Sequence, residues 1–257
     1  MLYNMPLYYD IIFERDVSKE IEFYIDCFKK YSEIDVKNIL EPACGTGIFL
    51  INFPRYGFSI TGYDISDNMV NYSTEIIKKH GYYDKASVVL GDMRILTFDP
   101  KLDAAIISIN SLGYLLTNDA IIEHFKSMSK SIVKGGIYIV EIVCAYRDIK
   151  KERKPDETWY AERNGIKIEA TWSPYQYDKI KKIRHVRFKM KVEDHSQTYI
   201  FEEKHELRLW FYRDFKNLIQ KGGFKIEAIY NQEFQELDPN LFIIGELGAL
   251  YYVLVNT

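Results

Sequence analysis

The chain has 257 residues, of which 47% are hydrophobic and 15% aromatic, and 34 Lys and Arg against 37 Asp and Glu give a formal net charge of −3. This composition excludes a disordered chain and a collagen-like repeat. At this length a single α/β domain buries about 70–75% of its unfolded surface, so a core can form without disulfides or metals.

Neither of the longest apolar stretches, residues 136–146 and 249–255, approaches the roughly 20 residues that cross a bilayer. The N-terminal segment lacks the basic and apolar regions of a secretory signal, so we expect a cytoplasmic protein. The cysteines share no C-x-x-C spacing, which argues against a disulfide framework and a metal site; they are Cys27, Cys44 and Cys144.

Apolar residues recur at helical spacing over residues 16–31, which predicts an amphipathic helix after an aromatic-rich N-terminal arm. Short apolar runs follow and predict five strands, at residues 36–40, 58–64, 86–92, 102–110 and 135–143. Between the last two runs, Thr117 or Asn118 is placed to cap a helix that ends near Gly135. Strands that alternate with helices predict a doubly wound parallel sheet.

Residues 147–154 are a charge run, and beyond it apolar and polar residues alternate across most of 166–210. This period of two predicts three antiparallel strands, joined by turns at 173–176 and 193–197. A helix is then expected over residues 211–221, followed by two final strands.

The expected fold class is α/β. Its doubly wound, mostly parallel, Rossmann-like sheet has seven strands and carries a small inserted antiparallel sheet. We expect residues 1–150 and 211–257 to form the core domain, and residues 151–210 to form the insertion.

A glycine-rich turn follows the first expected strand, where the sequence reads Glu-Pro-Ala-Cys-Gly-Thr-Gly from Glu41 to Gly47. Glycines there let a ligand approach the backbone, and the following N–H groups face its polar or anionic atoms. The dinucleotide fingerprint needs a third glycine where this chain has Leu50, so pyrophosphate binding is disfavoured.

Acidic residues end the second and third expected strands as well. Asp64 can accept from both hydroxyls of a ribose, and Asp92 from an adenine amino group while the Met93 N–H donates to the ring. A lone Asp at a strand end is more often a cap or a solvated loop residue. Acids at three successive carboxyl ends, where open α/β sheets bind ligands, indicate a nucleoside site.

In these motifs the chain resembles the class I S-adenosylmethionine-dependent methyltransferases, from Ile39 through Glu141 and more loosely to Phe224. The resemblance implies S-adenosylmethionine as the cofactor. It implies these contacts: Glu41, Ala43, Gly45 and Gly47 near the methionyl part, Asp64 on the ribose, Ile65 against the adenine, Asp92 and Met93 at its edge, and Tyr9 and Ile109 as further cofactor residues. The chain departs from the family at Ala43, where many members have glycine, and at Pro54, which interrupts the first helix.

The insertion precedes a helix that ends in Lys221-Gly222-Gly223-Phe224, which narrows the resemblance to the glycine and amino-sugar N-methyltransferase types. In those enzymes an antiparallel sheet covers the site of methyl transfer. Tyr8-Tyr9-Asp10 resembles their tyrosine-bearing lid. The implied activity is transfer of a methyl group to an N or O atom of a small-molecule acceptor.

His205 and Tyr9 are the candidate catalytic residues, because an ammonium acceptor must lose a proton and these side chains lie on the segments added to the sheet. A single histidine is more often a packing residue, and among 21 tyrosines a core role for Tyr9 is an equal alternative. The candidate substrate contacts, with the same alternative of core packing or helix capping, are Tyr8, Asn110, Tyr114, Trp172 and Trp210.

Two other functions stay open. A basic strand beside Tyr and Trp residues is compatible with an RNA-modifying methyltransferase; its cations are Lys179, Lys181, Lys182, Arg184, Arg187, Lys189 and Lys191. A net charge of −3 gives no overall attraction to phosphate, and such a strand is also typical of a solvated face. A non-catalytic S-adenosylmethionine-binding protein would keep the same motifs. The sequence is compatible with a monomer or a homodimer.

Overall fold

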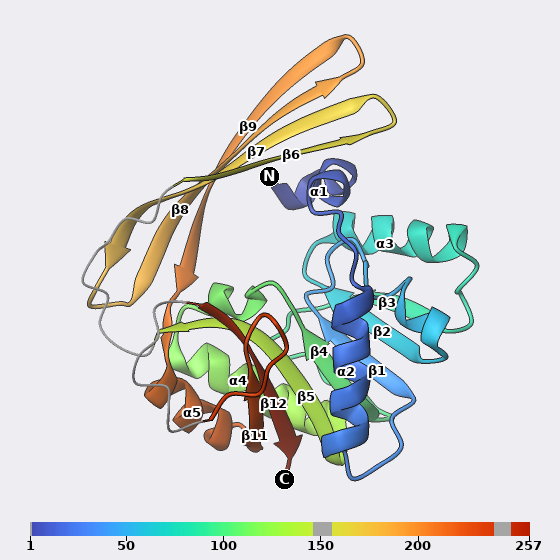
Figure 1. Ribbon diagram of the computed structural model, residues 1–257, viewed down its shortest axis with the longest axis vertical. Coiled ribbons are helices and arrows are strands. Elements are labelled where there is room, and N and C mark those ends of the chain that lie inside the picture. Colours follow the sequence, from blue (N-terminus) through green and yellow to red (C-terminus); the bar gives the residue numbers. More distant parts are fainter. Residues whose placement is uncertain (1, 146–155, 239–247) are drawn as a thin grey trace.

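The main sheet forms as expected. The computed structural model describes residues 2–145, 156–238 and 248–257, so the charge run at 147–154 and the domain boundary at 150 lie outside it. In the described part the strand order is β3-β2-β1-β4-β5-β12-β11, with short β10 (Trp210–Phe211) beside β5 (Figure 1). The strands are β1 Asn38–Pro42, β2 Ser59–Asp64, β3 Ala86–Leu90, β4 Leu102–Ile107, β5 Ile132–Ala145, β11 Phe224–Tyr230 and β12 Gly248–Asn256. Strands β1 to β5 pair in parallel and β12 is antiparallel to both neighbours, which confirms the Rossmann-like sheet.

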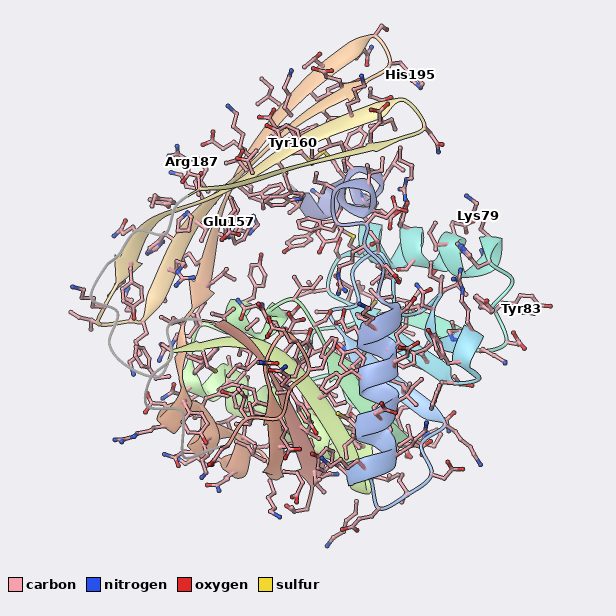
Figure 2. The ribbon with its side chains drawn as sticks, in the orientation of Figure 1. Lys79, Tyr83, Glu157, Tyr160, Arg187 and His195 are labelled. Atoms are coloured by element: carbon pink, nitrogen blue, oxygen red, sulfur yellow. The ribbon has the colours of Figure 1, made fainter. Side chains whose placement is uncertain are left out.

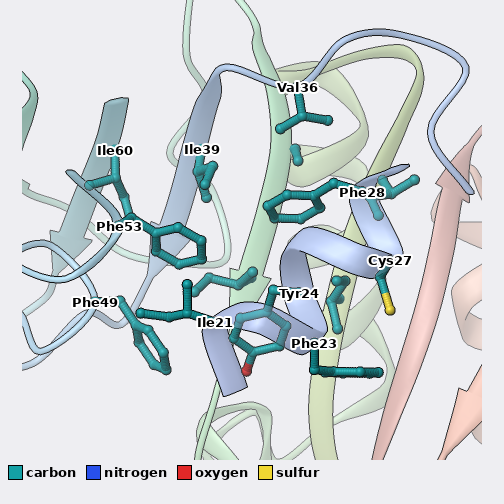
Figure 3. Close-up of a cluster of buried hydrophobic side chains, with 14 of the residues drawn as sticks. Ile21, Phe23, Tyr24, Cys27, Phe28, Val36, Ile39, Phe49, Phe53 and Ile60 are labelled. Atoms are coloured by element: carbon teal, nitrogen blue, oxygen red, sulfur yellow. The ribbon is translucent and has the colours of Figure 1, made fainter. Parts of the chain in front are cut away.

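Successive residues of the central strands point to opposite faces of this sheet and build two cores. Ile39 lies in one core and Leu40 in the other. The first face is covered by α2 (Ser18–Tyr31) and α3 (Asp67–Lys79), and the second by α4 (Asn118–Ser131) and α5 (Tyr212–Lys221). Figure 3 shows the first core, where Tyr24 of α2 packs near Phe49 and Phe53.

The segment after the glycine-rich turn is not an α-helix. Residues 48–52 form turns, and a short 3₁₀-helix, η2 (Phe53–Tyr56), follows. Pro54 has no N–H, and in an α-helix its ring would collide with the carbonyl four residues earlier. We expected Pro54 to interrupt a helix, but in the structure no α-helix forms anywhere in residues 48–56. Phe49 and Phe53 are fully buried, and their packing holds the segment in place.

The next helix differs from its expected limits. Thr117 rather than Asn118 caps α4, because its Oγ1 accepts from the Ala120 N–H at 3.1 Å. The helix ends at Ser131 and passes directly into β5. The expected end near Gly135 is wrong: Gly135 lies within β5 with a φ of 78°, so it bends a strand instead of ending a helix.

The inserted sheet has the strand order β6-β7-β8-β9, so its described part holds one strand more than expected. The added strand, β6 (Glu157–Arg163), pairs with β7 (Ile166–Asp178) through a turn at Asn164-Gly165, whose φ angles are 53° and 79°. Because Asn-Gly is a strong hairpin signal, the sequence did contain evidence for β6.

The turn expected at 173–176 is also wrong. β7 continues through it to Asp178, with an irregularity between Pro174 and Gln176, and pairs with β8 (Ile183–Asp194). β9 (Gln197–Arg208) follows β8 after the expected turn near His195.

The N-terminal arm connects the two sheets. It forms a 3₁₀ turn, η1 (Leu2–Asn4), and the helix α1 (Pro6–Ile12), which lies between the antiparallel sheet and α3 (Figure 1). Leu2 and Ile11 share a third core with Phe188 and Met190 of β8. No helix in the described residues is long and apolar enough to span a membrane.

Candidate active site

A cavity of about 740 Å³ lies between the carboxyl ends of the main-sheet strands, the N-terminal arm and the antiparallel sheet. Elements far apart in the sequence supply its walls. The strand ends contribute Glu41, Ala43, Gly45, Ile109 and Asn110; the arm contributes Tyr3, Tyr9, Phe13 and Arg15; the antiparallel sheet contributes Glu157, Trp159, Trp172, Arg184 and Leu207.

The glycine-rich turn at the base of the cavity has a left-handed backbone. Ala43, Gly45 and Gly47 have φ angles of 53°, 54° and 84°. A Cβ added at Gly47 would lie 3.0 Å from Ser73 Cβ, whereas one at Gly45 would meet only Tyr9 Cε1 at 3.8 Å. Packing therefore favours glycine at position 47, while Gly45 leaves its backbone accessible to a ligand.

A carboxyl side chain and a guanidinium side chain line the cavity beside this turn. Glu41 is 3% exposed, and its Oε2 has no hydrogen-bond partner among the described residues. Burial raises the pKa of Glu41 well above its usual value. Arg15 pairs with Glu20 and stacks over Phe49, with its Cζ 5.6 Å from the ring centroid. The free carboxyl oxygen and the guanidinium fit the ammonium and carboxylate of an amino acid.

Asp64 ends β2 next to the glycine-rich turn. Its Oδ2 accepts from the Gly45 N–H and its Oδ1 from the Ser66 N–H, each at 2.9 Å. These bonds orient the carboxylate and leave a lone pair on each oxygen. Ile65, next to Asp64, is 73% exposed, and Ile109, after β4, is 49% exposed, so both offer apolar surface to a flat ring. Ile109 lines the cavity, whereas Asp64 and Ile65 lie outside its lining.

Asp92 and Met93, after β3, contact neighbouring residues and do not line the cavity. Arg94 donates to Asp92 Oδ2 through Nη2 at 2.7 Å and Nε at 3.0 Å, and these bonds hold the pKa of Asp92 below its usual value. The Met93 carbonyl oxygen lies 2.7 Å from His124 Nδ1. A role for Asp92 at an adenine amino group stays a prediction, and it requires the carboxylate to bind a ligand beside Arg94.

A hydrogen-bonded chain of three side chains connects the arm with the antiparallel sheet. Tyr3 Oη donates to Tyr114 Oη at 2.7 Å, and Tyr114 Oη lies 3.1 Å from His205 Nδ1. His205 stacks on Trp172, with ring centroids 5.5 Å apart, and is 5% exposed. Burial lowers the pKa of His205, which favours a neutral imidazole.

Tyr3, Tyr114 and Trp172 line the cavity, but His205 lies one layer behind them. Direct contact of His205 with the transferred methyl group stays a prediction. The His205 ring packs against Trp172, and its hydrogen bond with Tyr114 connects it to the cavity.

Tyr9 and Asn110 lie on the cavity wall, as expected. The Tyr9 ring packs 4.5 Å from that of Phe13, and burial raises the pKa of Tyr9, so its hydroxyl keeps its proton. Asn110 Oδ1 accepts from the Val143 N–H at 3.0 Å, which holds Asn110 in a left-handed conformation with a φ of 55°.

Two of the expected substrate contacts lie elsewhere. Tyr8 Oη donates to Asp194 Oδ2 at 2.9 Å, on the antiparallel sheet. Trp210 is 1% exposed, and its Nε1 donates to the Leu112 carbonyl oxygen at 3.4 Å in the core. Neither Tyr8 nor Trp210 lines the cavity, so a substrate contact by either residue stays a prediction.

Sequence reasoning missed Arg15 and Tyr3. Both belong to the N-terminal arm and reach the cavity only because α1 packs on the antiparallel sheet. Their one sequence signal is their position on either side of Tyr8-Tyr9-Asp10.

Comparisons with known proteins agree with this geometry. Residues 39–136 match the family model described as a methyltransferase domain. The chain is 27% identical over 205 residues to a putative methyltransferase, YqeM, of Bacillus subtilis. This alignment covers 79% of this chain and 78% of the relative. It is 26% identical over 107 residues to the dTDP-3-amino-3,4,6-trideoxy-alpha-D-glucopyranose N,N-dimethyltransferase of Streptomyces venezuelae, covering 42% of this chain and 43% of the relative.

Structural similarity covers more of the chain than sequence similarity does. The crystal structure of an S-adenosylmethionine-dependent methyltransferase from Clostridium acetobutylicum superimposes with a TM-score of 0.79 at 18% identity, and the match covers 99% of each chain. The sheet order and the glycine-rich turn with its flanking acids agree with these matches. Residues 39–136 match a methyltransferase domain, and the whole chain has the fold of a solved S-adenosylmethionine-dependent methyltransferase.

Proposed function

We propose that this enzyme methylates an amino nitrogen of a small molecule, and that the acceptor is an amino sugar or a similar amine. The observation that carries the proposal is the chain Tyr3–Tyr114–His205, which leads from the cavity wall to a buried histidine whose pKa burial lowers. The similarity to a dimethyltransferase of a dTDP-linked amino sugar supports the same class of acceptor.

The residues beside the glycine-rich turn fit the methionyl part of the cofactor. When bound, S-adenosylmethionine supplies a methyl group on a positively charged sulfur. Glu41 would accept from its amino group and Arg15 would bind its carboxylate, because the cavity offers an unpartnered carboxyl oxygen and a guanidinium there. Asp64 binds the ribose hydroxyls, and Ile65 and Ile109 cover the adenine ring.

The amine must lose a proton before its nitrogen can react. Tyr114 Oη accepts this proton while its own proton passes to His205 Nδ1, with which it is already hydrogen-bonded. With the cofactor bound, the nitrogen lone pair would form the new N–C bond as the C–S bond breaks, and the electron pair of that bond would stay on sulfur. Tyr9 and Trp172 line the cavity and exclude water from it.

The basic strand gives less support to an RNA acceptor. On the outer face of β8, Arg187 Nε lies 3.2 Å from Glu202 Oε1, and Lys191 Nζ lies 2.6 Å from Glu193 Oε1. Arg184 lines the cavity instead, so the cations do not form one continuous patch. Interspersed acids reduce the attraction to a phosphate backbone.

Methyl transfer from labelled S-adenosylmethionine tests the proposal. A panel of amino sugars, the matching hydroxyl sugars and a bulk RNA sample would serve as acceptors. We expect label only on the amino sugars. Label on RNA alone supports the RNA-modifying alternative, and tight cofactor binding without transfer to any acceptor supports a non-catalytic protein.

A further inference from the structure

Arg184 differs from the other cations of its strand in the face that it occupies. Residues alternate along β8, and Arg184 shares a parity with the buried Val186 and Phe188, of which Phe188 packs against Phe13 of the N-terminal arm. It lines the cavity, whereas Arg187 has the opposite parity and is exposed. In Figure 2 Arg187 lies on the outer side of the antiparallel sheet and Glu157 on the side that faces the main sheet.

Within the described residues the Arg184 guanidinium makes no hydrogen bond and no ion pair, although the backbone of Arg184 pairs with both neighbouring strands. The charged and titratable groups that act on it are Glu157 and Tyr177, while burial lowers the pKa of its guanidinium. Nearby cations of the same sheet are paired: Arg187 with Glu202, and Lys182 with Asp214 at 2.7 Å. A half-buried guanidinium without a partner is unfavourable, so the site gains free energy when an anion binds to it.

The position of Arg184 relates it to the proposed proton acceptor. Arg184 pairs with Leu207 across the sheet, and Val186 pairs with His205. Two residues along a strand span about 7 Å. The guanidinium and the His205–Tyr114 pair are therefore offset along one wall of the cavity by roughly the width of a sugar ring.

We infer that the acceptor carries an anionic group, a phosphate or a carboxylate, which binds to Arg184. This inference rests on the proposed function, since it names the part of the acceptor that lies away from the reacting nitrogen. A planar guanidinium binds such groups through two parallel N–H···O bonds, which orients the acceptor as well as holding it. Arg184 is thus a specificity-determining residue.

Calorimetry on the full chain saturated with S-adenosylhomocysteine tests this inference. The probes are thymidine diphosphate, glucuronate and neutral methyl glucoside, which separate phosphate, carboxylate and sugar contributions. We expect one anionic probe to bind, Arg184→Gln to weaken its binding at least about tenfold, and Arg184→Lys to restore only part of the affinity. Arg187→Gln is the matched control, because it removes the same charge from the outer face of the same strand.

Four outcomes would each overturn the inference. Two concern the variants: unchanged binding in Arg184→Gln, or an equal loss in Arg187→Gln. Two concern the probes: methyl glucoside that binds as tightly as the anions, or no binding of either anion at millimolar concentration. The proposed function fails separately: anion binding that depends on Arg184 without methyl transfer to any amine would retain the subsite and reject the activity. Transfer to an anionic amino sugar that Arg184→Gln leaves unchanged would retain the activity and reject the subsite.

Discussion

Asp64 is the residue at which the cofactor assignment is most directly tested. Its carboxylate is oriented by two backbone N–H groups and is placed to accept from a ribose. We expect Asp64→Ala to weaken binding of S-adenosylhomocysteine by about 1.5–3 kcal/mol, because hydrogen bonds to a charged acceptor are lost. Calorimetry measures this, with Asp67→Asn, an exposed acid at the start of α3, as the control. Equal affinities in folded Asp64→Ala and wild type would place the ribose elsewhere.

Because Glu41 is buried beside the proposed cofactor site, we expect cofactor binding to depend on pH. Burial raises the pKa of this carboxyl, so it is protonated at a higher pH than an exposed glutamate. An ammonium group binds its ionised form, and we therefore expect affinity for S-adenosylhomocysteine to rise with pH as Glu41 loses its proton. Titrations from pH 5 to 8 should show this rise in the wild type and a flatter curve in Glu41→Gln. A parallel curve in that variant would contradict the role.

His205 and Tyr114 should act as one unit. His205→Asn and Tyr114→Phe are each expected to lower kcat by about 100-fold, with the double variant losing little more. Burial lowers the pKa of His205, so the acidic limb of the kcat profile should lie below the usual histidine value and disappear in His205→Asn. The assay uses the best amino sugar of the acceptor panel. If the losses of kcat in the two single variants add up in the double variant, or if His205→Asn keeps the acidic limb, His205 has only a packing role.

At the scale of elements, α1 is held over the cavity by polar contacts with two other elements. Asp10 Oδ2 lies 2.6 Å from Arg163 Nη2 of β6 and accepts from Tyr72 Oη of α3 at 2.9 Å. Asp10→Asn should loosen α1 and speed amide exchange over residues 6–12 by about fivefold, equivalent to about 1 kcal/mol. Glu14→Gln removes a weaker contact with the same arginine, at 3.5 Å, and serves as the control.

Faster exchange in Asp10→Asn should accompany weaker cofactor binding, because Tyr9 and Arg15 would lose their positions. Identical exchange in Asp10→Asn and Glu14→Gln would show that the apolar contacts of α1 hold it without these bonds.

For the whole molecule, a buried histidine links stability to pH. His124 lies between the Met93 carbonyl oxygen and Tyr138 Oη, at 2.7 and 2.9 Å, and burial lowers its pKa to about 4. The unfolded chain binds this proton near pH 6.5 and the folded chain does not, so the free energy of unfolding falls as the pH drops from about 6.5 to about 4. The loss approaches about 3 kcal/mol.

Urea unfolding at pH 7.5 and pH 5 measures this dependence. The difference between the two pH values should be smaller in His124→Gln, which cannot gain the proton. His80→Gln, an exposed position, should keep the wild-type difference. Equal differences in wild type and His124→Gln would assign the acid sensitivity to other groups.

Local patterns predicted much of the fold. The central strands are buried on both faces and so appear as continuous apolar runs, while the strands of the insertion alternate because one of their faces is solvated. Neither pattern contains the tertiary contacts that set element limits. Proline at position 54 therefore had a larger effect than expected, and β7 continued through Pro174 because its neighbour β8 supplies the pairing.

The sequence by itself determined which residues gather at the proposed cofactor end of the site, because Glu41, Gly45 and Asp64 end or follow strands whose order in a parallel sheet brings their carboxyl ends together. Only the tertiary structure decided the acceptor end. Tyr3, Tyr114 and His205 lie 91 or more residues apart in all three pairings, and they meet because the arm packs on the inserted sheet. The alternation of side chains along the strand places Arg184 and Arg187 on opposite faces of the inserted sheet. Which of the two faces is buried depends on the elements that pack against it, so only the assembled fold decides it.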